Sequence, residues 1–121
     1  MVGEYNFTIT QGSDDQNVVI YISDLDLTDY TAGMMIKPSK DTKSKYDHLT
    51  TENSRITIVY NAELEKWVVT LKFPSSVTSN YCWDEGLWDL ELYSNDTPPN
   101  VIRLLEGKVS INKEVTTQWV T

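Results

Sequence analysis

Hydrophobic and polar residues alternate through most of this chain, and a period of two residues is typical of β-strands with one buried face. One such row consists of Tyr5, Phe7 and Ile9, with polar residues between them. The alternation recurs in the segments 30–37, 56–60, 66–73, 88–92 and 104–111. Each of these segments predicts a strand that turns every second side chain toward a core.

Residues 18–22 are apolar without a break, which predicts one more strand, buried on both faces, and makes about seven in all. Clusters of Gly, Pro, Asn, Asp and Ser separate the strands and indicate turns, as at 12–15 and 94–100. The one helical candidate, 74–80, begins with proline and is a turn or two at most. The pattern predicts an all-β, antiparallel fold, either a β-sandwich or a partly open barrel.

The aromatic residues divide into two groups. Most fall on the inward positions of the expected strands, where they predict core: Tyr5, Phe7, Tyr30, Tyr60, Trp67, Phe73 and Trp88. Others fit no inward row, notably Trp83, Tyr93 and Trp119. Exposed Tyr and Trp are favoured at protein interfaces, so these three are the candidate interface residues, and Trp119 is the preferred contact with another subunit.

Length and charge restrict the possible partners. The 121 residues form a single domain, 1–121, large enough to bury one core, and the single Cys82 cannot form an internal disulfide. The net charge of −8 repels phosphate, so neither nucleic acid nor an anionic membrane is an expected partner. No apolar stretch approaches the roughly 20 residues that cross a bilayer, and the first residues do not resemble a signal peptide. We therefore expect a protein made and kept in the cytosol.

Candidate chemistry is sparse. His48 and Cys82 are the only residues of their types, which offers a conceivable nucleophile and base but no clustered zinc ligands. Asp89 and Glu91 share one face of a strand, like the paired acids of a glycosidase, although a solvated face balanced by Lys108 and Arg103 on the next strand explains them better. The acidic segment 24–29 does not match a helix–loop–helix calcium site. We expect no enzyme activity and no cofactor.

Several segments resemble the N-terminal immunoglobulin-like domain of upper-baseplate proteins of tailed phages. The similar segments follow the same order through nearly the whole chain: 7–13 (Phe-Thr-Ile-Thr-Gln-Gly-Ser), 26–32 (Asp-Leu-Thr-Asp-Tyr-Thr-Ala), 49–53, 56–58, 88–92, 103–109 and 114–116. The chain departs from the family at Asp29, where glycine is usual, at 82–83 and at 98–99. None of the similar segments is a catalytic motif.

The resemblance implies an immunoglobulin-like β-sandwich and a virion structural protein of the neck, tail, baseplate or capsid decoration. Such a protein is made in the host cytoplasm, binds other virion proteins and assembles as several copies. The alternative is a carbohydrate-binding module that recognises a host-surface glycan through Trp83, Tyr93 or Trp119. The two hypotheses differ in whether these aromatics lie on a flat surface or line a groove.

Overall fold

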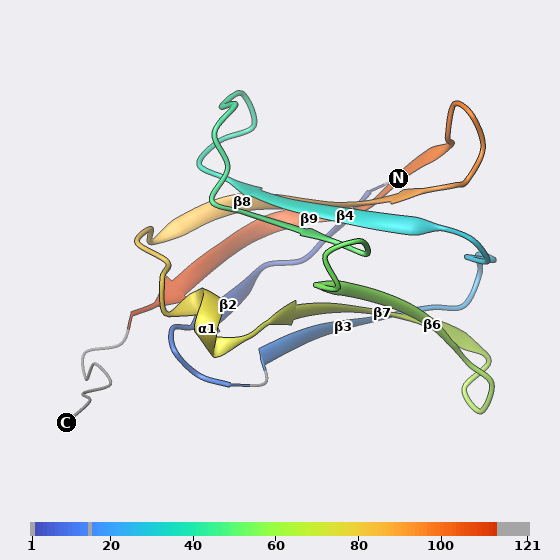
Figure 1. The fold of residues 1–121 in the computed structure, drawn as a ribbon, viewed down its shortest axis with the longest axis horizontal. Helices are drawn as coiled ribbons and strands as arrows, with labels where there is room; N and C mark the ends of the chain where they lie inside the picture. The colour runs from blue at the N-terminus through green and yellow to red at the C-terminus, as the bar shows by residue number, and fades with distance from the viewer. Residues whose placement is uncertain (1, 15, 114–121) are drawn as a thin grey trace.

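The structure is a computed structural model that describes residues 2–14 and 16–113, and it consists of two β-sheets that face each other (Figure 1). The larger sheet has the order β1-β9-β8-β4-β5, and β2 also pairs with β9. Its strands are β1 (Gly3–Glu4), β2 (Phe7–Thr10), β4 (Thr31–Lys37), β5 (Asp47–Thr50), β8 (Glu85–Tyr93) and β9 (Val101–Asn112). The smaller sheet has the order β3-β7-β6, with β3 (Gln16–Ile22), β6 (Ile56–Asn61) and β7 (Lys66–Phe73).

Most neighbouring strands are antiparallel, as the alternation predicts, but β1 and β2 run parallel to β9. Helix α1 (Ser75–Thr78) follows Pro74 and confirms the helical candidate. No described helix is long and apolar enough to cross a membrane. The described residues form nine strands against the expected seven or so. Two of them, β1 and β5, contain only two and four residues, too few to produce a recognisable alternation.

The core lies between the two sheets and is built from the predicted inward rows. In the larger sheet, β4 contributes Met34 and Ile36, and β8 contributes Trp88, Leu90 and Leu92. In the smaller sheet, the buried row of β7 is Val69, Leu71 and Phe73. The prediction of one face buried per strand is confirmed for these three strands.

The prediction that residues 18–22 are buried on both faces is wrong. In β3 the side chains alternate, and Val19 and Tyr21 are 43% and 56% exposed. The physical reason is that nothing in the described structure covers the outer face of the smaller sheet, to which β3 belongs. An apolar run without alternation therefore signals an exposed apolar surface in this chain.

Two of the predicted core aromatics are also half exposed. Tyr5 lies between β1 and β2, outside a strand, and stacks on Phe7 at the margin of the core with ring centroids 5.8 Å apart. Tyr60 is near the end of β6, where its ring packs edge-on against Trp67. Both rings cover the border of the core, because the sheets end close to these positions.

Candidate functional site

The outer face of the smaller sheet is the first candidate surface. We call it the smaller-sheet face and define it by the outward residues Val19, Tyr21, Thr57, Val59, Val68 and Thr70. Strand register aligns them in two rows across the sheet, because Tyr21 and Val59 both pair with Val68, while Val19 and Thr57 both pair with Thr70. The result is an apolar area on the surface of a strongly charged chain.

The smaller-sheet face carries little charge. At its outward strand positions the charged side chains are Lys66 and Lys72, at opposite ends of β7, and none of these positions holds an acid. Among the described residues, the acids nearest along the chain lie in the connecting segments, as Glu63 and Glu65 do in the turn between β6 and β7, and Asp24 does after β3. Because the whole chain has a net charge of −8, the acids must lie mainly on other surfaces.

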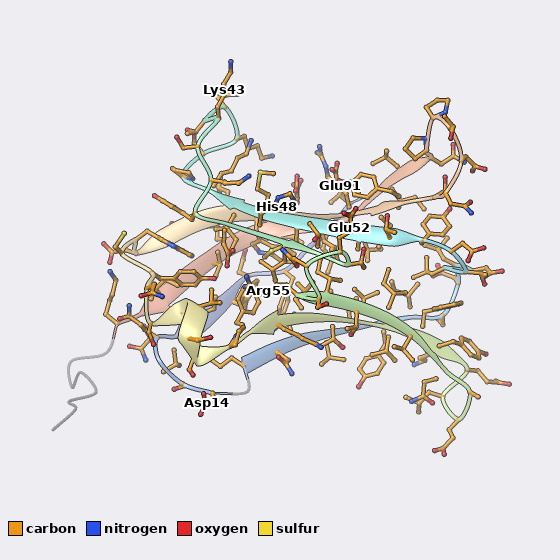
Figure 2. All side chains as sticks on the ribbon, in the orientation of Figure 1. Asp14, Lys43, His48, Glu52, Arg55 and Glu91 are labelled. Carbon is orange, nitrogen blue, oxygen red and sulfur yellow. The ribbon has the colours of Figure 1, made fainter. Side chains whose placement is uncertain are left out.

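A hollow of about 480 Å³ over the larger sheet is the second candidate. Its floor is the outer face of β4, β8 and β9, and β5 contributes His48. The loop 38–46 rises above this face at one end of the sheet and adds Ser39 and Lys40, while the loop 94–100 rises at the other end (Figure 1). Figure 2 places His48 and Glu91 on this outer side, away from the smaller sheet.

Tyr93, one of the three sequence candidates, lines this hollow. A Cβ atom at Gly33 would lie 3.3 Å from Tyr93 Cε2 and 3.4 Å from its hydroxyl, so the ring leans across β4 in the space that glycine leaves. The Tyr93 hydroxyl donates a hydrogen bond of 2.9 Å to Glu91 Oε1. Burial, together with this bond, raises the pKa of Tyr93 to about 12, so the phenol stays protonated at neutral pH.

The charged residues of the hollow form a network around Arg103. Its Nε lies 3.7 Å from Asp89 Oδ2 and 3.8 Å from Glu91 Oε2, and its Nη1 lies 3.9 Å from Glu106 Oε1. The prediction that bases of the next strand balance the two acids of β8 is confirmed for Arg103, whereas Lys108 forms no ion pair with either acid in the described structure. Burial raises the pKa of Asp89, and the neighbouring Glu91 raises it further, because two carboxylates on one face repel each other.

A buried ion pair between the two sheets is the third cluster of charge. Arg55, which precedes β6, lies between the sheets (Figure 2). Its Nη2 and Nη1 donate hydrogen bonds to the two oxygens of Asp47 on β5, at 2.9 and 3.2 Å. The Tyr81 hydroxyl also donates to Asp47, and Arg55 Nε donates to the Lys72 carbonyl. This cluster joins the sheets and is structural, because its polar groups bind one another.

Of the other two sequence candidates, Trp83 and Trp119, the structure describes only Trp83. Trp83 is only 7% exposed and stacks on Tyr46, with ring centroids 4.6 Å apart and an interplanar angle of 2°. The expectation of an exposed interface side chain at Trp83 is therefore wrong: the loop 38–46 folds back and covers it through Tyr46. Trp119 lies outside the described residues.

The remaining chemical hypotheses meet little support in geometry. His48 lines the hollow, whereas Cys82 is exposed in the segment between α1 and β8. Over residues 2–14 and 16–113, no group of three or more His, Cys, Asp or Glu side chains could hold a metal ion. In the acidic segment 24–29, Asp26 accepts hydrogen bonds from the Thr28 amide and hydroxyl, the usual role of Asp in a turn.

Sequence reasoning missed the smaller-sheet face and the hollow, although a signal for each was present. Val68 and Met35 both fall on outward positions of well-defined strands, yet both are apolar. Apolar residues at neighbouring outward positions of a sheet indicate a surface that contacts a partner or ligand.

A scan against models of known protein families finds no match, and a search of curated proteins finds none either. The resemblance to phage upper-baseplate proteins stays a prediction.

Proposed function

We propose that this chain is a structural component of a tailed-phage virion that acts by binding other virion proteins. The sequence resemblance motivates the virion setting. The order of the strands supports an immunoglobulin-like β-sandwich: β3-β7-β6 follows the order of strands B-E-D, and β9-β8-β4-β5 follows the order G-F-C-C′ of a variable-type domain. Such a domain has one more strand, A, beside B. A rigid scaffold of this kind presents its faces, edges and loops to partners.

The smaller-sheet face is the observation that carries the proposal. Val59, Tyr21 and Val19 are 59%, 56% and 43% exposed, and they lie on adjacent rows of one sheet. Scattered apolar side chains are common on protein surfaces, but a contiguous apolar face marks a site of association. Covering it removes apolar area from water, which stabilises a complex by about 25 cal/mol per Å² before the costs of association.

The partner that fits this face is a protein surface with an apolar centre. Carboxylates opposite Lys66 and Lys72 would add specificity more than affinity. The strands β3 and β6 end the smaller sheet, and each pairs only with β7 within the described structure. Their free backbone groups therefore offer a second mode of contact, the addition of a strand from a neighbouring virion protein.

Incorporation of the Val59→Lys variant into virions tests the proposal. The change places a charge within the apolar face at an exposed position of β6, so we expect little effect on folding, within about 0.5 kcal/mol, and a large loss of the chain from assembled particles. Quantitative mass spectrometry of purified virions measures that loss. The matched control is Val101→Lys, which makes the same substitution at a 53% exposed valine of β9 and is expected to assemble normally.

Two results would contradict the proposal in different ways. Virions that contain none of the wild-type chain would remove the virion setting altogether. Equal incorporation of both lysine variants would leave the setting but exclude the smaller-sheet face as the contact.

A further inference from the structure

The hollow over the larger sheet is on the opposite side of the molecule from the smaller-sheet face, and the proposed assembly role does not use it. Its volume of about 480 Å³ falls within the range of roughly 300–1,000 Å³ that is typical of small-molecule sites. It is lined by residues from five strands and one loop, so the tertiary structure fixes its shape. A concave surface of this size suits a small ligand better than a flat protein partner.

The floor of the hollow combines an aromatic ring with apolar side chains. Met35 and Leu87 contribute apolar surface from β4 and β8. Because Gly33 has no side chain, the Tyr93 ring leans across β4 into the space next to which a Cβ atom would lie. The Tyr93 ring also lines the hollow. A ring that lies along a sheet offers a flat face to the C–H groups of a ligand.

The polar side chains of the hollow contact one another without a ligand. Tyr93 and Arg103 both bind Glu91, and Arg103 also contacts Asp89. Each carboxylate has more acceptor sites than these contacts use, and a guanidinium has five donors. Hydrogen bonds to such ionised groups are stronger than those between neutral groups. The site is therefore suited to a ligand with several hydroxyl groups.

The charge of the lining indicates the charge of the ligand. The formal charges cancel, because four acids accompany four bases: Glu4, Asp89, Glu91 and Glu106 against Lys37, Lys40, Arg103 and Lys108. An anionic ligand would meet the field of a chain with net charge −8, and a cation would meet the bound Arg103. A neutral ligand avoids both costs.

We propose that this hollow binds a neutral sugar of a glycan, with one pyranose ring packed on Tyr93 and Met35 and its hydroxyls bound by Glu91, Asp89 and Arg103. Of the aromatics that sequence alone suggested for glycan binding, only Tyr93 lies in this site among those that the structure describes. The chain would then carry a ligand site on one face and a protein contact on the other.

An NMR titration of ¹⁵N-labelled protein tests the sugar site. The probes are glucose, galactose, N-acetylglucosamine and the disaccharides lactose, cellobiose and maltose. We expect at least one to bind saturably, with a Kd on the order of 1 mM, and to shift the amide signals of Gly33, Met35 and Glu91 while leaving Val59 unchanged. Glucuronate, which adds a negative charge, is expected to bind more weakly than glucose.

Substitutions then assign the binding to the hollow. Tyr93→Ala is expected to weaken the sugar at least about tenfold, whereas Tyr93→Phe keeps the ring and is expected to stay within about threefold, because it loses only the bond to Glu91. Arg103→Gln changes a half-exposed side chain without loss of core and is expected to cost about tenfold. Tyr60→Ala, at a half-exposed tyrosine of the smaller sheet, is the control and is expected to bind like the wild type.

The proposal fails if no probe shifts the signals of the hollow at about 50 mM, a concentration that would reveal even very weak affinity. It also fails if Tyr93→Ala and Arg103→Gln bind like the wild type, or if glucuronate binds more tightly than glucose. None of these results bears on virion incorporation, so the two proposals fail independently.

Discussion

Asp47 connects the two sheets through a single carboxylate. Its oxygens accept hydrogen bonds from the side chains of Arg55 and Tyr81, and Oδ1 also accepts one from the backbone amide of the next residue, His48. Burial alone would raise the pKa of Asp47, but the bonds from Arg55 and Tyr81 outweigh burial and hold the pKa below its ordinary value. The ionised form is therefore favoured by folding, which links the stability of the protein to pH.

Asp47→Asn should lower the free energy of unfolding by about 1–3 kcal/mol at pH 7, because it removes the negative charge that pairs with the largely buried Arg55 and leaves a weaker acceptor in its place. A depressed pKa adds stability above the ordinary Asp value of about 3.9, and this stability disappears as pH falls through the lower folded value. The difference between wild type and variant should thus shrink below about pH 4. Urea unfolding at pH 7, 4 and 3 measures it.

Arg103→Gln is the control for Asp47→Asn. The ion pairs of Arg103 lie at the surface and are expected to contribute less than about 1 kcal/mol to the free energy of unfolding. A pH-independent effect of Asp47→Asn would contradict the role assigned to its charge.

At the scale of elements, the N-terminal segment depends on one glycine of β9. The segment between β1 and β2 passes directly over Gly107, where a Cβ atom would lie only 1.9 Å from the Tyr5 carbonyl oxygen. Around this crossing, the Tyr5 amide donates to the Glu106 carbonyl at 2.9 Å, and Trp88 Nε1 donates to the Tyr5 carbonyl at 3.1 Å. Glycine is needed at this position because the two backbones approach so closely.

Gly107→Ala should displace this crossing and lower the free energy of unfolding by about 1–3 kcal/mol, the usual cost of an overpacked position. The amide of Tyr5 should exchange with solvent faster, because its bond to Glu106 is broken. Hydrogen exchange followed by NMR measures this effect. Lys108→Ala, at the exposed neighbouring residue, should change stability by less than about 0.5 kcal/mol; an equally small effect of Gly107→Ala would contradict the packing argument.

At the scale of the whole molecule, the two sheets share one core. Phe73 of the smaller sheet contacts Phe7 of the larger sheet, with ring centroids 5.7 Å apart, and Phe7 contacts Trp88 at 5.3 Å. Aromatic contacts therefore continue from one layer to the other. Because neither sheet can bury its inner face alone, the two should fold and unfold together.

Phe73→Ala should lower the free energy of unfolding by about 3–5 kcal/mol, since Phe73 is fully buried at this junction. In the wild type and in Phe73→Ala, circular dichroism and tryptophan fluorescence should each report one and the same unfolding transition, because unfolding is cooperative. Leu64→Ala, in the exposed turn after β6, should have little effect. Two separate transitions in the wild type would contradict a shared core.

Much of the fold was predictable from local pattern. The inward rows of β4, β7 and β8 follow from alternation, the turns follow from clusters of turn-forming residues, and the short helix follows from Pro74. The burial of Trp83 was not predictable, because it precedes β8 in a segment without alternation, and a distant residue, Tyr46, covers it. The exposure of Tyr21 was not predictable either, because an apolar run does not reveal whether both faces of its sheet are covered.

The sequence by itself determined the class of fold, the face that most strands bury, and the acidic, cysteine-poor character of the surface. These properties depend on residue type and on spacing along the chain. Only the tertiary structure decided which outer faces are apolar, hollow or charged. Gly33 of β4 is far in the sequence from Tyr93 and Arg103 of the consecutive strands β8 and β9, and the three form one site because β4, β8 and β9 lie side by side. Strand order depends on how the whole core packs, which local spacing does not encode.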